Sequence, residues 1–169
     1  MKTAGAVVII VAAYIFGHMK RGTKLESERI LGQMVKLMGE IKSSVEHSAA
    51  SLVHTITTCA YKEAYNKLGF LAKAVVDPRT DLYLGEVLCD ALQNWENASL
   101  LSRDERSLII GVLCEIGSDC GKNETAKLGF AIERLEETLE TRRESNKKHK
   151  GYYETIFTLA GIAAAILLI

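Results

Sequence analysis

The sequence has few features that favour β-structure or nucleic-acid binding. Its 169 residues include a single proline, and no turn pattern typical of a β-hairpin is present, which favours an all-α fold. The 21 basic and 21 acidic residues cancel to a net charge of zero, so no net positive field attracts nucleic acid. The length is enough for about one domain.

The sequence also lacks a long apolar run. The two most apolar stretches, residues 4–16 and 156–169, have lengths typical of a core helix or of a signal peptide. Counted with their flanks, residues 2–19 and 152–169 each give about 27 Å of helix at about 1.5 Å per residue, close to the roughly 30 Å of a bilayer core. Because lysines and tyrosines flank them as interfacial residues do, we predict two transmembrane helices, 2–19 and 151–169.

A cleaved signal peptide is the alternative interpretation of the N-terminal segment. Signal peptides end in a small-residue A-x-A site, which is missing here. The stretch HMKRGTK follows the apolar run at once, and such a basic flank is typical of a stop-transfer segment. We therefore predict a retained anchor.

Basic residues flank both predicted spans on the side of the central region. Only Lys2 and the amino terminus carry positive charge on the other side. Under the positive-inside rule this asymmetry places residues 20–139 in the cytoplasm and both termini across the membrane. The flanking residues are Lys20, Arg21, Lys24 and Arg29 after the first span, and Arg142, Arg143, Lys147, Lys148 and Lys150 before the second.

The cysteines of the chain form no C-x-x-C pair. In the reducing cytosol that the orientation predicts, a disulfide framework is not expected. We therefore expect small core residues or free thiols at Cys59, Cys89, Cys114 and Cys120.

Apolar residues of the central region recur at spacings of three and four, which predicts amphipathic helices. We expect six, and the first continues directly from the first span. Ser102 and Glu105 have the spacing of a capping box, Asp77-Pro78 ends the third helix, and Trp95 belongs to the buried face of the fourth. The six helices are marked by Leu31 to Val45, Leu52 to Cys59, Leu68 to Val75, Leu84 to Trp95, Ser102 to Gly117, and Asn123 to Leu139.

Residues 140–150, ETRRESNKKHK, contain no strong hydrophobe, so a helix there has no face to bury and must be solvated. We predict a polar helical stalk between the bundle, 20–139, and the second span, and one long helix running through both. The predicted architecture is an all-α, six-helix cytoplasmic bundle whose first and last helices extend into two transmembrane spans.

One stretch is similar to a phosphate-binding motif but does not match it. The segment GSDCGKN, residues 117–123, is similar to a phosphate-binding P-loop. It is one residue short, has Asn123 in place of the required hydroxyl, and follows a helical segment. A helix stop at Gly117 followed by a new cap is the favoured interpretation.

Other chemically active residues do not form a site either. His47, His54 and Cys59 lack the close spacing of metal ligands. The paired carboxylates Glu136 and Glu137 fit a solvated helix face. We therefore expect no enzyme activity, no cofactor, and no catalytic, cofactor-binding or metal-binding residues.

Motifs at both ends and at one helix junction occur together in this chain. They are Lys2, Gly5-Ala6, Gly17, Arg29 and Glu40-Ile41 near the start, Gly117-Ser118-Asp119 at the junction, and Tyr153, Gly161 and the final ILLI at the end. In this order and register they resemble the bacterial stage III sporulation protein AB family.

The resemblance implies a scaffold. That family is similar to the cytoplasmic helical domain of the platform protein in type II secretion and type IV pilus machines. It belongs to the channel complex that joins mother cell and forespore during endospore formation. The implied partners are a cytoplasmic secretion-type ATPase, stage III sporulation protein AA, and other stage III sporulation channel proteins. The implied place is the mother-cell membrane facing the forespore.

A second class of function stays open. A helical domain tethered to a membrane by two helices is also typical of a signalling or regulatory adaptor that binds another cytosolic protein. Capture of the detergent-solubilised chain with its partners separates the two, because an ATPase supports the platform and a kinase or transcription regulator supports the adaptor. No nucleic-acid partner is expected, and self-association into a homo-oligomer is left open.

Overall fold

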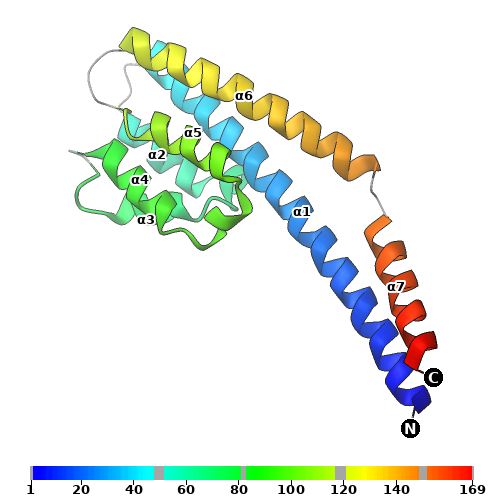
Figure 1. The fold of residues 1–169 in the computed structure, drawn as a ribbon. Coiled ribbons are helices and arrows are strands. Elements are labelled where there is room, and N and C mark those ends of the chain that lie inside the picture. The colour runs from blue at the N-terminus through cyan, green and yellow to red at the C-terminus, as the bar shows by residue number, and fades with distance from the viewer. Residues whose placement is uncertain (1, 48–51, 81–82, 117–120, 149–151, 169) are drawn as a thin grey trace. The chain divides into compact units, whose positions relative to one another are not determined.

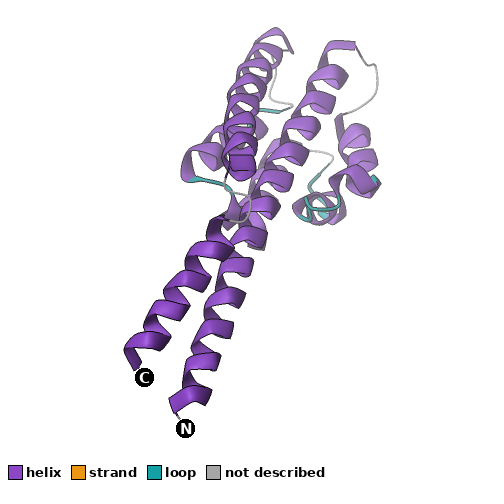
Figure 2. Ribbon diagram, turned by 90° about the vertical axis from the view of Figure 1, so that its right-hand side faces the viewer, coloured by secondary structure: helices purple, strands orange, loops and turns teal. Residues whose placement is uncertain are grey.

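The computed structural model describes residues 2–47, 52–80, 83–116, 121–148 and 152–168. Every regular element in these ranges is a helix, and no strand occurs among them (Figure 1, Figure 2). The predicted all-α class is therefore confirmed. The α-helices are α1 (Lys2–His47), α2 (Leu52–Tyr61), α3 (Phe70–Val76), α4 (Leu84–Gln93), α5 (Arg103–Leu113), α6 (Gly121–Lys148) and α7 (Tyr152–Leu168), with short 3-10 helices η1 (Glu63–Tyr65) and η2 (Glu96–Leu100).

The chain forms two compact units. The central unit comprises Arg29–Glu140, and the terminal unit comprises Met1–Glu28 together with Thr141–Ile169. Both boundaries fall inside long helices, α1 and α6, so each of these helices contributes residues to both units.

The core of the central unit is built from the apolar faces of its helices. In α1 and α6 the buried side chains recur every three or four residues, so one face of each helix packs inward as the periodicity predicted. Burial of these side chains supplies the main driving force for folding the unit. The buried residues of α1 include Ile30, Met34, Leu37 and Ile41, and those of α6 are Leu128, Ala131, Leu135 and Leu139.

Local sequence features set the ends of the middle helices. At the start of α5 the Ser102 hydroxyl accepts a hydrogen bond from the backbone N–H of Glu105 at 3.2 Å, and the Glu105 carboxylate accepts one from the Ser102 N–H at 2.7 Å. The predicted capping box is thus confirmed. The helix α3 ends at Val76 with Asp77 as its cap, directly before Pro78, as also predicted.

The middle helices are shorter than the apolar pattern predicted. Since α4 ends at Gln93, Trp95 lies beyond it, at the start of η2. Its side chain is nevertheless 7% exposed, so the predicted burial is confirmed although the predicted helical position is wrong. The helix α5 ends at Leu113, and the expected stop at Gly117 lies outside the described residues.

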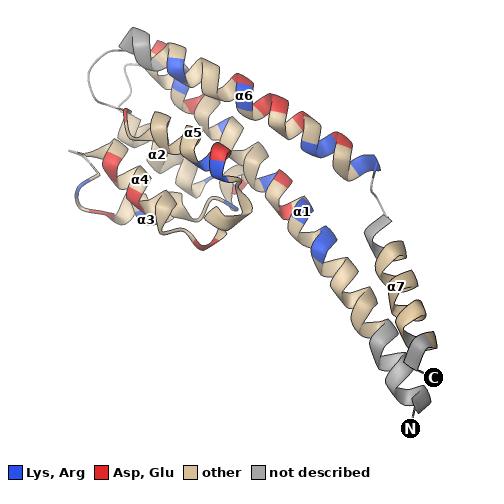
Figure 3. Ribbon diagram, in the orientation of Figure 1, with Lys and Arg blue, Asp and Glu red and all other residues tan. Residues whose placement is uncertain are grey.

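The described part of the terminal unit consists of the start of α1, the end of α6, and α7. The described side chains of α7 are uncharged (Figure 3). The rings of Phe16 and Phe157 meet edge to face with centroids 5.3 Å apart, and Gly17 and Gly161 are buried. A buried glycine on each of two helices is typical of close helix packing.

Polar contacts join α6 to α1 within the same unit. The Asn146 amide donates to the Glu28 carboxylate at 2.7 Å, and the Arg143 guanidinium lies 3.6 Å from the same carboxylate. Arg142 donates a hydrogen bond to Ser27. Residues 140–148 of the predicted stalk are therefore helical, but several of their polar side chains bond to protein and not only to water.

Among the described residues, no helix combines enough length with enough apolarity to cross a bilayer. The two expected spans, 2–19 and 151–169, therefore gain no support from the structure and stay predictions from the sequence. The expected continuous last helix is also not seen, because α6 ends at Lys148, α7 begins at Tyr152, and the junction lies outside the described residues.

Candidate functional site

A polar cluster surrounds Glu40 on α1. Its carboxylate accepts hydrogen bonds from the Lys62 ammonium at 2.9 and 3.0 Å and from the Tyr65 hydroxyl at 3.0 Å. The thiol of Cys59 lies 3.7 Å from the same carboxylate, as a weak donor. The cluster therefore ties the end of α2 and the helix η1 to α1.

The electrostatics of this cluster disfavour nucleophilic chemistry. Hydrogen bonds from Lys62 hold the pKa of the Glu40 carboxyl below its usual value. Burial, together with the nearby Glu40 charge, raises the pKa of the Cys59 thiol to about 11 and also raises the pKa of Tyr65. Because the thiolate is the reactive form, Cys59 is an inert core thiol at neutral pH.

The contacts of Glu40 form one clamp on α1. A second clamp, at Gln33, lies two helical turns before Glu40 on the same face of this helix. The side-chain amide of Gln33 accepts from the backbone N–H of Lys67 at 2.9 Å and donates to the Asn66 side chain at 3.2 Å. Gln33 and Glu40 together hold the segment that follows α2. These hydrogen bonds position the backbone of residues 62–67 and use the polar groups of Gln33 and Glu40 for that purpose.

The residues weighed as metal ligands do not converge. His54 is exposed on α2, whereas the neighbouring thiol of Cys59 contacts Glu40, and the side chain of His47 lies outside the described residues. Within the described ranges, no group of three or more histidine, cysteine or acidic side chains has the geometry to hold a metal ion.

The remaining chemical candidates are the P-loop-like stretch and the carboxylates Glu136 and Glu137. Residues 117–120 of the P-loop-like stretch lie outside the described residues, and Gly121 begins α6. Glu136 and Glu137 are exposed as expected, and Glu137 lies 3.2 Å from the Arg134 guanidinium one turn earlier.

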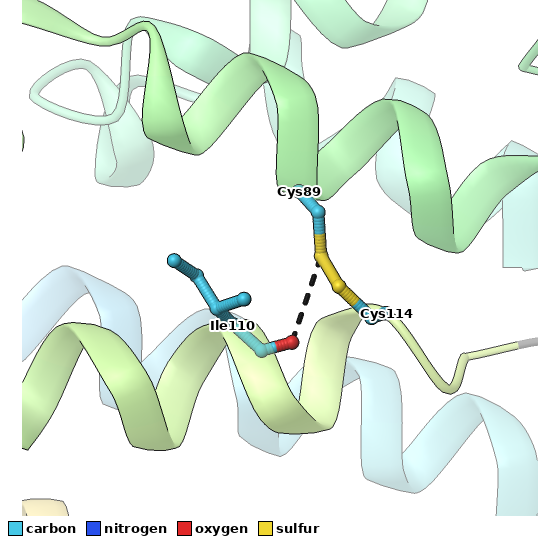
Figure 4. The surroundings of a disulfide bond; sticks show 3 residues. All are labelled: Cys89, Ile110 and Cys114. Carbon is cyan, nitrogen blue, oxygen red and sulfur yellow. Dashed lines mark hydrogen bonds between the residues drawn. A yellow bond between two sulfur atoms is a disulfide. The ribbon is translucent and has the colours of Figure 1, made fainter.

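The cysteines are the clearest error of the sequence-based expectation. A disulfide joins Cys89 in α4 to Cys114 at the end of α5, with Cα atoms 5.8 Å apart, inside the usual range (Figure 4). The two cysteines are 25 positions apart, so no local spacing motif predicts the pair. The bridge is possible because α4 packs against α5. Cys59 is a free, buried thiol as expected, and Cys120 lies outside the described residues.

An open groove of about 680 Å³ lies between α5 and α6 in the central unit. Its apolar lining comes from Leu108, Gly111 and Val112 on α5 and from Ala126 and Phe130 on α6, with polar groups from Asp104, Ser107 and Lys127. Phe130 is 59% exposed, although an exposed aromatic ring is costly to leave in water. Such a surface has room for an apolar side chain.

The groove was not predicted from the sequence, although one signal for it is present there. The apolar face of α6 contains Leu128, Ile132, Leu135 and Leu139, and Phe130 lies off that face. An aromatic residue on the polar side of an amphipathic helix marks a candidate contact surface.

Comparison with known proteins identifies a family. The model of the family described as Stage III sporulation protein AB matches residues 2–169, which is nearly the whole chain and includes both units. No curated protein and no solved structure matches.

Proposed function

The chain belongs to the stage III sporulation protein AB family, and from that premise we propose that it is the membrane-anchored platform of a secretion-like channel between mother cell and forespore. Its role is to dock a cytoplasmic secretion-type ATPase and to hold it beside the other stage III channel proteins. In this proposal the chain carries no catalytic residues of its own.

The observation that carries the proposal is the extent of the family match. It includes the apolar termini as well as the central unit, so the whole chain, and not one shared helix pair, has the family pattern. A platform also needs a domain that keeps its shape under load. The dense core of the central unit and the two clamps on α1 suit that requirement.

We propose that residues 2–19 and 151–169 anchor the chain in the mother-cell membrane and that the central unit is cytoplasmic. The support is the placement of basic residues on the central side of both apolar ends. A reporter that is active only outside the cytoplasm should be silent when inserted at Glu96 and active when fused after Ile169. The reverse pattern would contradict both the orientation and the ATPase partner.

We propose that the groove between α5 and α6 is the docking face for the ATPase. It is apolar, open and lined by an exposed ring, which are features of interface hot spots. A residue of the ATPase with an apolar side chain would bury the Phe130 ring, while Asp104 and Lys127 add polar contacts beside it. Removing the ring should therefore weaken docking without unfolding the chain.

The test is capture of the full-length chain from detergent extracts of sporulating cells. The wild type should recover the stage III ATPase, and Phe130→Ala should reduce recovery about tenfold or more, as expected for loss of a hot-spot ring. Val76→Ala is the matched control, since Val76 is 79% exposed on α3 and away from the groove.

The outcomes separate the alternatives. Equal recovery by wild type and Phe130→Ala would exclude the groove as docking face while leaving the platform role intact. Recovery of a kinase or a transcription regulator in place of the ATPase would support the adaptor and overturn the platform.

A further inference from the structure

The bridge between Cys89 and Cys114 has an unequal environment at its two ends. Cys89 lies in the middle of α4 and is 4% exposed, with its sulfur 3.5 Å from the Ile110 carbonyl oxygen (Figure 4). Cys114 is the residue directly after α5 and is exposed. A soluble reagent therefore reaches the bridge from the side of Cys114.

A second contact holds the same two helices together without the bridge. Gly85 lies one turn before Cys89 on α4, and a Cβ atom at Gly85 would lie 2.7 Å from the Cys114 carbonyl oxygen and 3.0 Å from that of Leu113. The backbones of α4 and the end of α5 thus approach closely because position 85 has no side chain. This contact is between backbone atoms and does not involve the sulfur–sulfur bond.

We propose that Cys89 and Cys114 form a reversible thiol–disulfide exchange site whose co-reactant is a dithiol protein reductant or, in the oxidising direction, its disulfide. The exposed end makes the bridge accessible, and the Gly85 contact makes it able to re-form. A purely structural bridge needs neither feature. Cytoplasmic disulfides are mostly of this exchanging kind, and the proposed cytoplasmic location of the central unit agrees with it.

The reaction balances in two steps. A thiolate of the reductant attacks the sulfur of Cys114, the sulfur–sulfur bond breaks, and its electron pair goes to the sulfur of Cys89, which takes a proton from water. The second thiol of the reductant, as thiolate, then attacks the mixed disulfide and releases Cys114, which is protonated in turn. Two electrons and two protons pass to the protein, and the reductant becomes a disulfide.

Opening of the bridge changes how firmly the end of α5 is held against α4. The bridge closes a loop over a sequence separation of 25 residues, and its loss should lower the melting temperature by about 10 °C. The last turn of α5 carries Gly111 and Val112 of the groove, so the oxidised form holds that wall of the groove fixed against α4.

The first experiment uses the full-length wild-type chain, purified in mild detergent and equilibrated with a series of dithiothreitol redox buffers. Free thiols are then alkylated, and peptide mass mapping scores the linked Cys89–Cys114 peptide. We expect the native chain to pass from about nine tenths bridged to about one tenth bridged across the series, and to return on reoxidation. A bridge that opens only after denaturant is added, or that never forms, would overturn the proposal.

The second experiment tests which sulfur is attacked. Cys89→Ser leaves the thiol of Cys114, whose thiolate should attack a one-cysteine reductant supplied as its activated mixed disulfide with thionitrobenzoate, so that the Cys114–reductant disulfide forms and thionitrobenzoate leaves. The matched variant Cys114→Ser leaves the buried Cys89, which should form at least tenfold less of the mixed disulfide. Equal trapping by both variants, or more by Cys114→Ser, would overturn the assigned direction. This reaction of purified protein does not depend on the ATPase, so its failure is distinguishable from failure of the platform role.

Discussion

The carboxylate of Glu40 helps Gln33 to hold the segment after α2 against α1. Its partners, Lys62 and Tyr65, are more than twenty positions away in the sequence, so only the folded chain brings them together. The Glu40 and Lys62 side chains are 40% and 43% exposed, so water screens much of their attraction. The hydrogen bond from the buried Tyr65 adds to the contact with Lys62.

This geometry predicts how stability depends on pH. The pKa of Glu40 is lowered in the folded chain, so its stabilising effect is fully present above the usual value of 4.5 and is lost as pH falls through the lowered pKa. Glu40→Gln should therefore be less stable than wild type at pH 7, and the difference should shrink below pH 4.5. Urea midpoints measured from pH 7 to pH 3 check this. A constant difference across the series would show that Glu40 does not act through its charge.

Trp95 is a buried aromatic residue whose removal should be costly. Its ring centroid lies 5.5 Å from that of Phe70, and it is buried at the junction of α4 and η2. Trp95→Ala should cost about 3 to 5 kcal/mol of unfolding free energy, because it leaves a large cavity. Denaturant titration of the full-length chain measures this, with Tyr61→Ala, at a residue 78% exposed, as the control. Equal stability of the two variants would show that Trp95 is not a core residue.

Elements were predictable where their signals are local. The capping box at Ser102 and the stop at Asp77-Pro78 involve neighbouring residues, and both were placed from the sequence. The end of α4 before Trp95 was missed, because an apolar residue continues the pattern whether it lies on the helix or just past it. The Cys89–Cys114 pair and the groove were missed because each depends on how two helices pack.

Gly85 tests the packing of α4 against α5. A methyl group there would lie within 3.0 Å of three backbone carbonyl oxygens, and backbone cannot move aside as a flexible side chain can. Gly85→Ala should therefore cost about 1 to 3 kcal/mol despite the better helix propensity of alanine.

The matched control is Gly39→Ala on α1, where a methyl group would meet no atom within 4 Å. That variant should gain about 0.5 to 1 kcal/mol, because alanine loses less backbone entropy in a helix. Thermal unfolding of both variants gives the comparison. A stabilised Gly85→Ala would mean that α4 and α5 pack less closely than their carbonyl contacts indicate.

For the whole molecule, the family was predictable because its motifs lie at both ends of the chain and at one helix junction, and the family model matches residues 2–169. Membrane insertion depends on the bilayer, which acts as the solvent of an apolar helix. The bilayer is not part of the folded chain. The packing of the two apolar ends on each other is a separate property. It is visible in the contact of Phe16 with Phe157 and in the burial of Gly161.

That packing gives the last prediction. Gly161 lies one turn after Phe157 on α7 and is buried, so a larger side chain there must push α7 away from its neighbour. Overpacking of this kind costs about 1 to 3 kcal/mol, or roughly fivefold to a hundredfold in the population of the packed pair. Under the proposed membrane anchoring and channel role, Gly161→Leu should stay in the membrane fraction, because it is more apolar, while sporulation efficiency and recovery of channel components fall. Ala163→Leu is the matched control, since Ala163 is exposed on the same helix and gains the same side chain. Full sporulation with leucine at position 161 would show that the C-terminal helix needs only to be apolar, and that its contact with α1 has no part in assembly.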